Sequence, residues 1–387
     1  MNFKLNEEQQ LLQQSVREFC NRLIVPNAAK WDAEERFPHE IIAPMAELGL
    51  LGMQIPTEYG GGGMSAMDYV VALEEVARAD ASMGLTMASH NSLCTGHIFL
   101  AGTEEQRRKY IPELASGKVL GAWGLTEPGS GSDAGAARTR AERRVGPNGE
   151  VTWSLTGSKT FITQGSVAKY YTILASTSPE KKQKGLTAFI VEKGTPGFRS
   201  GRKIEKMGLN ASDTTELILE DVVLPDSQRL GDIDAGFNDT LKILDKGRVG
   251  IGAWAVGIGT AAYEAAKQYA KDRVQFGRPI SDFQGVAFMI ADMATELEAA
   301  RLMVWRSAWM QDQGMKNTRA ASEGKYYAAR AAMRACNSAL QIHGGYGYTR
   351  EFPVERYFRD IKLAEIGEGT NEVQKMVIAR ELLKDVA

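Results

Sequence analysis

The chain has 387 residues, of which 43% are hydrophobic and 24% are charged, and its 46 Lys and Arg residues nearly balance its 48 Asp and Glu residues. A chain of this length is too long for one simple core, so two or three domains are expected. The charge balance argues against a general electrostatic attraction to nucleic acid or to an anionic membrane, and neither is expected as a partner.

The first part of the chain, 1–118, is predicted to be an all-α domain. Apolar residues between 11 and 24 recur at three- and four-residue spacing and give one apolar stripe, as in an amphipathic helix. Further helices are expected at 66–78 and 104–115. The glycine run within 57–64 is expected to form a flexible turn.

The second part, 119–232, has the pattern of β-structure. Val151, Trp153 and Leu155 alternate with polar residues, which is typical of a half-buried strand. The segments 170–177, 185–194 and 214–224 repeat this character with short turns between them. We expect an antiparallel sheet that forms a small barrel or sandwich.

The third part, 233–387, is helical again. Helices are predicted at 241–272, 283–313, 318–342 and 371–385, which together could form a four-helix bundle. The chain is therefore predicted to be a multidomain α+β protein with the order α, β, α. Two GxGxxA segments at 250–255 and 257–262 lie inside the first of these helices. They lack the preceding strand of a dinucleotide fingerprint, so we interpret them as small residues that allow close helix packing.

Several sites and segments are not expected. Cys20, Cys94 and Cys336 are widely separated, which suggests a reducing compartment without a disulfide framework. No HExxH or CxxC motif occurs, so a catalytic metal is not expected. The N-terminus lacks the features of a targeting segment, and the longest uncharged stretch, 249–263, is short of the ~20 apolar residues that span a bilayer. A soluble cytoplasmic protein is the simplest interpretation.

Glu368 is the first candidate for chemistry, because it lies between Gly367 and Gly369 just before a predicted helix. It is either a solvated loop residue or a base that reaches into a cavity. The loop WGLTEPGSGSDAG (123–135) could approach a flat ring or a phosphate with backbone donors, or could be an ordinary surface turn. Asp245 and Arg248 of DKGR could simply pair on a helix. The glycines of QIHGGYGY (341–348) could simply cap one.

The order of these motifs is more informative than any one of them. GLTEPGSGSD, FIT (161–163), DKGR, RVQFGRPISDFQ, QIHGGYGY and RDIKLAEIGEGTNE together resemble the acyl-CoA dehydrogenase family over nearly the whole chain. The resemblance implies non-covalent FAD and oxidation of an acyl-CoA thioester to its trans-2-enoyl form, as in the β-oxidation of fatty acids. A base removes the C2 proton, hydride passes from C3 to flavin N5, and electrons continue to an electron-transferring flavoprotein.

The resemblance also assigns residues. Glu368 matches the family's base, and the position where some relatives carry a Glu base instead is Gly247 here. The implied substrate contacts are Ser132, Asp245, Arg248 and Gly369. The implied FAD contacts within one subunit are Trp123, Leu125, Thr126, Gly131, Ser132, Phe161, Ile162, Thr163, Thr370, Asn371 and Glu372. Those implied across a subunit boundary are Arg273, Phe276, Gln284, Gln341, Gly344 and Gly345, which implies an oligomer, normally a homotetramer built as a dimer of dimers.

One departure from the family pattern bears on the substrate. Many relatives have Tyr directly before the catalytic Glu, whereas this chain has Gly367, and the segment HNSLC (90–94) resembles short-chain members. A straight or branched short-chain acyl-CoA is therefore expected, with medium-chain, aromatic and alicyclic acyl groups left open. The alternatives are an oxygen-using acyl-CoA oxidase of the same fold, an enzyme working in the reductive direction, and a non-catalytic helical scaffold that binds CoA esters.

Overall fold

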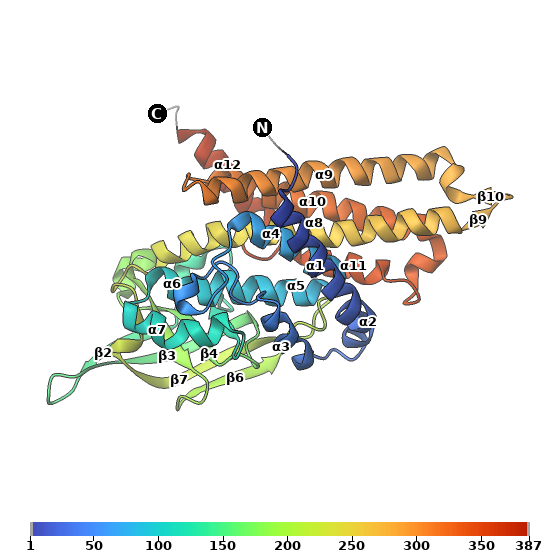
Figure 1. The fold of residues 1–387 in the computed structure, drawn as a ribbon. Helices are drawn as coiled ribbons and strands as arrows, with labels where there is room; N and C mark the ends of the chain where they lie inside the picture. Colours follow the sequence, from blue (N-terminus) through green and yellow to red (C-terminus); the bar gives the residue numbers. More distant parts are fainter. Residues whose placement is uncertain (1–2, 385–387) are drawn as a thin grey trace.

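The N-terminal helices lie where the sequence pattern predicts them in the computed structural model, which describes residues 3–384 (Figure 1). The predicted amphipathic helix is α1, the helix expected at 66–78 is α4, and the one expected at 104–115 is α7. Each of these three begins with a capping box, formed by Asn6, Ser65 and Thr103 with the residue three positions later. The helices are α1 (Glu7–Leu23), α2 (Val25–Ala33), α3 (His39–Glu47), α4 (Ala66–Ala79), α5 (Ala81–Ala88), α6 (Gly96–Ala101) and α7 (Glu104–Ala115), with a π-helical segment at Ser89–Thr95 between α5 and α6.

The central part forms one eight-stranded sheet with the order β6-β7-β3-β2-β4-β5-β8, and β1 pairs with β4. The strands are β1 (Gly121–Gly124), β2 (Arg140–Val145), β3 (Val151–Thr163), β4 (Tyr170–Ser176), β5 (Leu186–Glu192), β6 (Phe198–Lys203), β7 (Thr214–Pro225) and β8 (Arg229–Leu230). The expected β domain is confirmed, but the expectation of a purely antiparallel sheet is wrong. β1 runs parallel to β4, and β2 meets β4 in a parallel bridge. Neither pair is joined by a hairpin, so no tight turn imposes antiparallel pairing on them.

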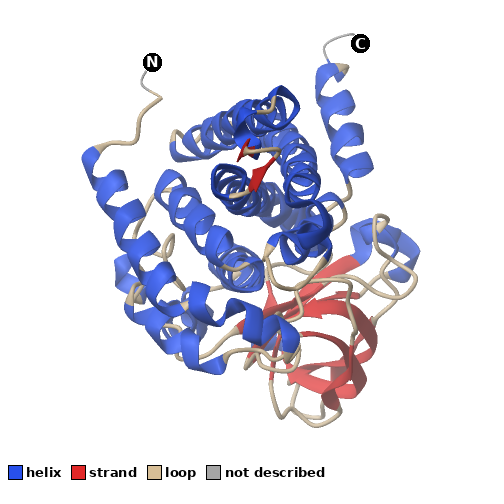
Figure 2. Cartoon of the chain, turned by 90° about the vertical axis from the view of Figure 1, so that its right-hand side faces the viewer, coloured by secondary structure: helices blue, strands red, loops and turns tan. Residues whose placement is uncertain are grey.

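β4 is buried along its whole length rather than on one face. Tyr170 and Leu174 pack against helical residues such as Ile111, while Tyr171 and Ile173 face the core between the strands. The sheet is therefore covered by the N-terminal helices on one side, and Figure 2 shows the strands as one group beside the helical layers. β1 also packs against the π-helical segment Ser89–Thr95, so it lies where the sheet meets the N-terminal helices.

The C-terminal part is a helical domain, as predicted. Its helices are α8 (Gly236–Asp272), α9 (Gln284–Asp312), α10 (Thr318–His343), α11 (Val354–Ile361) and α12 (Asn371–Leu382), and the short strands β9 (Val274–Gln275) and β10 (Arg278–Pro279) form a hairpin between α8 and α9. α8 begins five residues before the predicted start at 241. The predicted end of the last helix at 385 lies outside the described residues. The predicted four-helix bundle consisted of α8, α9, α10 and α12, but α12 packs chiefly on α10. It is α4 of the N-terminal part that packs along α8 and α9.

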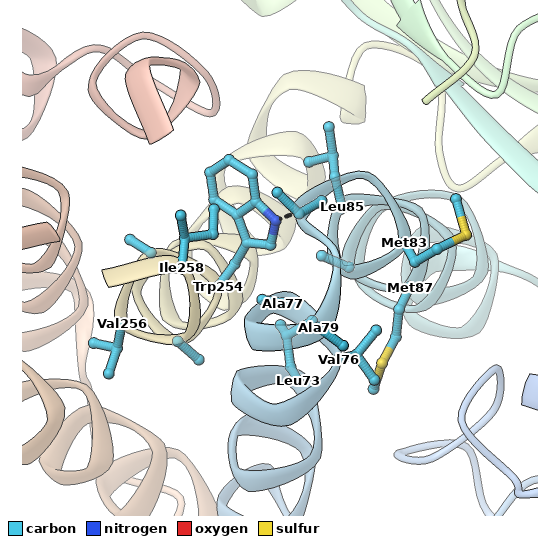
Figure 3. Close-up of a cluster of buried hydrophobic side chains, with 14 of the residues drawn as sticks. Leu73, Val76, Ala77, Ala79, Met83, Leu85, Met87, Trp254, Val256 and Ile258 are labelled. Carbon is cyan, nitrogen blue, oxygen red and sulfur yellow. Dashed lines mark hydrogen bonds between the residues drawn. The ribbon is translucent and has the colours of Figure 1, made fainter. Parts of the chain in front are cut away.

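The small residues inside α8 allow close helix contacts, as the sequence interpretation proposed. A Cβ at Gly257 would lie 2.4 Å from the carbonyl oxygen of Glu74 on α4, and one at Gly259 would lie 2.5 Å from Leu297 on α9. Figure 3 shows the adjoining core, in which the Trp254 indole packs among side chains of α4 and α5. Its Nε1–H donates to the carbonyl of Ala81 at 2.8 Å. This hydrogen bond joins α8 to the first residue of α5.

Candidate active site

Glu368 lies in the turn between the 3-10 segment Lys362–Glu365 and α12, and it points inward. Its φ is 50° and that of Gly369 is 88°, so both residues adopt the left-handed region that only glycine occupies readily. The carboxylate oxygen Oε2 is buried and has no hydrogen-bonding partner within residues 3–384. A Cβ built on Gly247 of α8 would lie 2.1 Å from this oxygen. The carboxylate therefore occupies space that the absent side chain at 247 leaves, and Glu368 is not a solvated loop residue.

The charge of Glu368 is held in a poorly solvated place. Burial raises the pKa of the carboxyl to about 7, and the nearby positive charges of Lys325 and Arg248 oppose that rise. Tyr69 of α4 also lies close enough for the Glu368 charge to add to the rise in the phenol's pKa that burial causes. The Tyr69 hydroxyl is itself buried without a partner among the described residues. A carboxyl with a pKa near 7 is a far better proton acceptor at neutral pH than one near 4.

Asp245 and Arg248 form the ion pair on α8 that the sequence suggested. Arg248 Nη1 donates to Asp245 Oδ1 and lies 3.5 Å from Ser322 Oγ, and Thr318 Oγ1 donates to Asp245 Oδ2 at 2.7 Å. Arg248 is 5% exposed, and its Nε–H has no acceptor in the described part of the chain. A buried guanidinium with a free donor beside Glu368 could hold a carbonyl or phosphate oxygen of a bound ligand.

Two side chains donate hydrogen bonds to the backbone of the Glu368 turn. Lys325 Nζ of α10 donates to the carbonyl of Gly369 at 2.8 Å, and Gln374 Nε2 of α12 donates to the same carbonyl at 2.9 Å. Gln374 Nε2 also lies 3.3 Å from the carbonyl oxygen of Glu368. Thr370 caps α12 through its side chain, which accepts from the N–H of Val373 at 3.3 Å. Glycine is favoured at 369 because its φ of 88° would strain any other residue, and a Cβ there would also press on the Gln374 amide at 2.8 Å.

The remaining predicted residues of this segment are at the start of α12. Asn371 is buried, and its Nδ2 lies 3.4 Å from Glu365 Oε1 while its Oδ1 has no partner within residues 3–384. Glu372 lies in the first turn of α12. Asn371 thus leaves one buried acceptor available to a ligand.

The loop 123–135 is tied to the sheet by a buried ion pair. Lys159 of β3 is completely buried, and its Nζ donates to Glu127 Oε1 at 2.7 Å and to the carbonyl of Leu125 at 3.1 Å. Glu127 also accepts the backbone N–H groups of Arg138 and Thr139. The Thr126 carbonyl accepts the N–H of Thr160 at 2.9 Å. The loop is therefore a built structure rather than an ordinary surface turn.

The loop's tip is open, while its first residue is anchored. Ser132 and Gly131 are exposed, and a Cβ at Gly131 would meet no atom within 4 Å. Trp123 of β1 is half-buried, and its indole N–H donates to His97 Nδ1 at 3.0 Å. A ring-shaped or phosphate-bearing ligand could approach the backbone at the tip without a steric block.

The FIT segment, 161–163, departs from regular strand geometry at Phe161. Phe161 has a φ of 57° and is 65% exposed, in a region where the β3–β7 register shifts between Lys159 and Ile162. Ile162 is 2% exposed and packs within the sheet core, so only its backbone could contact a ligand. Thr163 is half-buried. An exposed aromatic ring in a strained backbone conformation next to the anchored loop indicates a ligand surface rather than a packing role.

The other predicted cofactor residues lie at the far end of the helical domain. Arg273 follows α8, and Phe276, which is 93% exposed, lies at the tip of the β9–β10 hairpin (Figure 1). Arg273 is 25 residues beyond Arg248 along the same helix, which corresponds to about 38 Å at 1.5 Å per residue. The cofactor residues predicted at this end are all exposed, namely Arg273, Phe276, Gln284, Gln341, Gly344 and Gly345. One chain does not bring them together with Glu368.

Gly344 ends α10 with a φ of 58°, so the capping role proposed from sequence is present. Arg273 lies over the ring of Tyr346 just beyond it. The β9–β10 hairpin and the glycine-rich turn at 344–348 therefore meet at one exposed end of the helical domain.

Several residues around the site were missed by the sequence analysis. Lys325 and Gln374 support the Glu368 turn, Tyr69 faces Glu368, and Lys159 and His97 anchor the loop at 123–135. Lys325 carried a readable signal, because it shares the buried face of α10 with small apolar residues at 321, 328 and 332. A lysine at such a position is unusual unless its charge has a use. Tyr69 carried no comparable signal, because Glu368 is distant from it in sequence. Gln374 is only five and six residues from Gly369 and Glu368, but a glutamine in the first turns of a helix is too common to indicate a support.

No cluster of three or more His, Cys, Asp or Glu residues within 3–384 could hold a metal ion. None of the helices within those residues combines the length and apolarity needed to cross a bilayer. The titratable groups that act on or respond to the Glu368 charge are the Lys325 ammonium, the Arg248 guanidinium and the Tyr69 phenol.

Comparison with known proteins agrees with the motif order. Sequence models of the acyl-CoA dehydrogenase N-terminal, middle and C-terminal domains match residues 6–118, 122–222 and 234–383. The chain is 44% identical to the short-chain specific acyl-CoA dehydrogenase of Clostridium acetobutylicum, over 99% of this chain and 100% of the relative. It is 42% identical to the acryloyl-CoA reductase (NADH) of Anaerotignum propionicum, over 99% of this chain and 96% of the relative. The structure of butyryl-CoA dehydrogenase from Megasphaera elsdenii superposes with a TM-score of 0.96 at 41% identity, covering 99% of this chain and 100% of that one.

Proposed function

The chain belongs to the acyl-CoA dehydrogenase family, and from that premise we propose that it catalyses the FAD-dependent α,β-dehydrogenation of a short-chain or branched short-chain acyl-CoA, with Glu368 as the base. The observation that carries the proposal is the position of the Glu368 carboxylate. Its Oε2 is buried against Gly247 without a partner within residues 3–384, and burial raises its pKa to about 7. A group held in this state is suited to accept a weakly acidic proton.

The reaction places two demands on the chain's own residues. Glu368 must take the C2 proton of the thioester, and the negative charge that develops on the thioester oxygen needs a donor placed in advance. The backbone N–H of Glu368 has no acceptor among residues 3–384, and the left-handed turn that presents it is fixed through the Gly369 carbonyl. We therefore assign this N–H to the thioester oxygen.

Substrate binding is assigned to residues near the base. The buried Arg248 with its free Nε–H and its partner Asp245 would contact the acyl-CoA, as would Ser132 at the open tip of the loop and the backbone of Gly369. The segment HNSLC, which suggested a short-chain substrate, lies in the π-helical segment Ser89–Thr95 and is wholly buried. π-helical segments occur frequently at functional sites, which agrees with a role for this segment in shaping the acyl pocket.

FAD fits the residues that the structure leaves uncommitted. The exposed Phe161 ring, the open loop tip at Gly131 and the unpartnered Asn371 Oδ1 suit a flat apolar ring with a polar edge and an attached phosphate. When bound, FAD supplies the acceptor for the C3 hydride. The residues that would hold it in one subunit are Trp123, Leu125, Thr126, Gly131, Ser132, Phe161, Ile162, Thr163, Thr370, Asn371 and Glu372.

A second subunit is part of the proposal. Arg273 lies about 38 Å along α8 from Arg248. As the family resemblance implies, we assign to the FAD of a neighbouring subunit the residues Arg273, Phe276, Gln284, Gln341, Gly344 and Gly345. A homotetramer arranged as a dimer of dimers would satisfy this geometry. An electron-transferring flavoprotein as electron acceptor and a cytoplasmic location complete the proposal.

The reductive direction is the second candidate. The relative named acryloyl-CoA reductase (NADH) is 42% identical over nearly its whole length. Residues that remove a proton in one direction deliver it in the other, so the site geometry serves both. An oxidase reacting directly with oxygen differs from both in its electron acceptor.

The test is anaerobic mixing of the FAD-loaded protein with a panel of acyl-CoAs and enoyl-CoAs, followed through the flavin absorbance. Bleaching of the oxidised flavin by butyryl-CoA or a branched short-chain acyl-CoA supports the proposal. Admission of oxygen in place of an electron-transferring flavoprotein then separates an oxidase from a dehydrogenase. The proposal is contradicted if the purified protein contains no flavin, or if no acyl-CoA in the panel bleaches the flavin.

A further inference from the structure

Lys325 is a buried lysine without a carboxylate partner. It is 1% exposed on the inner face of α10, and it forms no ion pair with any carboxylate of residues 3–384. Its Nζ instead donates to the Gly369 carbonyl at 2.8 Å. Lysines are almost never fully buried unless they are paired. Burial lowers the pKa of Lys325 to about 8, so at neutral pH and below the chain keeps in its interior an ammonium without an ion pair. This ammonium is bound to the residue next to the candidate base.

The contact of Lys325 is with a turn that needs support. Glu368 and Gly369 have positive φ angles, and such a conformation in a non-glycine residue costs of order 1–3 kcal/mol and persists only when its surroundings enforce it. Two donors from two different helices converge on this turn, Lys325 from α10 and Gln374 from α12. Only one of the two donors carries a charge.

The charges around Glu368 come from every packed element. α10 contributes Lys325, α8 contributes Arg248 with its partner Asp245, and α4 contributes the neutral phenol of Tyr69. Glu365 before the turn and Glu372 on α12 act on Lys325, and Arg380 of α12 acts on Arg248. Because Asp245 already neutralises Arg248, Lys325 is the positive charge near Glu368 that has no direct counter-ion of its own.

We propose that Lys325 is a positioning residue for the base, which clamps the Gly369 carbonyl and supplies the uncompensated positive charge that keeps Glu368 ionised in its buried site. The proposal rests on the proposed function in taking Glu368 as the base. The ammonium acts through the backbone and through space, and it does not contact the reacting carbons. Gln374 hydrogen-bonds to the same carbonyl but is uncharged. The effect of the hydrogen bond can therefore be separated from the effect of the charge within this chain.

The experiment compares Lys325→Met, which removes both donor and charge, with Gln374→Met, which removes a donor to the same carbonyl and no charge. The FAD-loaded variants are titrated between pH 5 and 9 by infrared difference spectroscopy of the protonated carboxyl band, with Glu368→Gln as the blank. The pH profile of flavin reduction is measured in parallel. Lys206→Met serves as the lysine control, because Lys206 is a partly buried lysine that also donates to a backbone carbonyl, that of Ser212.

Loss of the charge is expected to raise the carboxyl midpoint in Lys325→Met by about one pH unit or more, since an opposite charge nearby favours the ionised form. A shift of one unit lowers the rate at pH values below the midpoint about tenfold. Gln374→Met is expected to slow the reaction with its midpoint unmoved, and Lys206→Met to keep the wild-type midpoint.

An unmoved midpoint in a flavinated Lys325→Met enzyme would overturn the proposal, as would equal shifts in Lys325→Met and Gln374→Met. Lys325→Gln, which is also uncharged, carries the same comparison if Lys325→Met does not fold. The infrared titration reads ionisation without turnover. A failure of this inference is therefore distinguishable from a failure of the proposed dehydrogenation, which would appear as full activity in Glu368→Gln.

Discussion

Gly247 of α8 makes room for the carboxylate of Glu368. A Cβ at 247 would lie 2.1 Å from Glu368 Oε2 and 3.1 Å from its carboxyl carbon. The family pattern implied that a Glu base can stand at position 247 or at position 368. In this chain position 247 has no side chain, and the Glu368 carboxylate occupies the space beside it. The two positions are therefore alternatives for steric reasons.

Gly247→Ala is expected to displace the Glu368 carboxylate and lower the rate of flavin reduction. Misplacement of a catalytic group by about 1 Å can cost about 10²-fold in rate, and we expect a loss of that order with FAD content retained. Equal rates for Gly247→Ala and the unaltered enzyme would show that the carboxylate does not depend on this space.

The pH dependence should distinguish the two directions of the reaction. The raised pKa of about 7 means that Glu368 is protonated below that pH and ionised above it. Dehydrogenation needs the ionised form, so the rate of flavin reduction by acyl-CoA should rise as the pH increases through about 7. Reduction of an enoyl-CoA needs the protonated form, so its rate should fall over the same range. Stopped-flow measurement of both half-reactions checks this, and two flat profiles would exclude Glu368 as the titrating group.

Gly367 is expected to set the width of the acyl pocket. A Cβ at 367 would lie 3.4 Å from Leu363 Cγ, a tight contact that a small shift can relieve, so larger side chains should be tolerated by the fold. Gly367→Tyr should then reduce kcat/KM for branched or bulky acyl-CoAs more than for butyryl-CoA. The expected discrimination is about 1–3 kcal/mol for a methylene-sized change. Gly367→Ala is the control, and equal losses for all substrates would show that Gly367 serves the backbone instead.

Arg273 is expected to couple FAD binding to assembly. The residue is exposed within one chain, and we assign its guanidinium to the pyrophosphate of FAD in a neighbouring subunit, where it could bind two oxygens at once. Arg273→Ala should lower flavin content and weaken the oligomer, because a ligand that bridges subunits stabilises their assembly. Arg273→Lys should restore this in part.

The measurement for Arg273 is flavin absorbance together with mass from size-exclusion light scattering, with and without added FAD. Arg278→Ala is the control, because it removes another arginine of the β9–β10 hairpin, one that also lies over an aromatic ring of its own chain but is not assigned to FAD. A fully flavinated Arg273→Ala oligomer that survives dilution would contradict the assignment.

The sequence predicted the parts of the fold whose contacts are local. The capped helices α4 and α7 were placed within a residue of their observed ends, because capping residues and apolar spacing are both written in short segments. The parallel pairing of β1 with β4 and the packing of α4 along α8 were not predictable in this way. They depend on contacts between residues far apart in the chain, as do the supports of the site by Lys325 and His97. The motif around Glu368 indicated a base, but the hollow at Gly247 that receives its carboxylate emerged only in three dimensions.

The central claim is that Glu368 is the base, and Glu368→Gln tests it most directly. The amide preserves the shape of the side chain but cannot accept the C2 proton, so the variant should keep FAD and bind acyl-CoA while losing flavin reduction. General-base contributions are typically about 10²–10⁴-fold, and we expect a loss at the upper end of this range or beyond it. The measurement is anaerobic stopped-flow reduction of the bound flavin by butyryl-CoA, with acyl-CoA binding followed separately. A variant that retains more than about a tenth of the wild-type rate would contradict the account, because such a small loss lies below the general-base range.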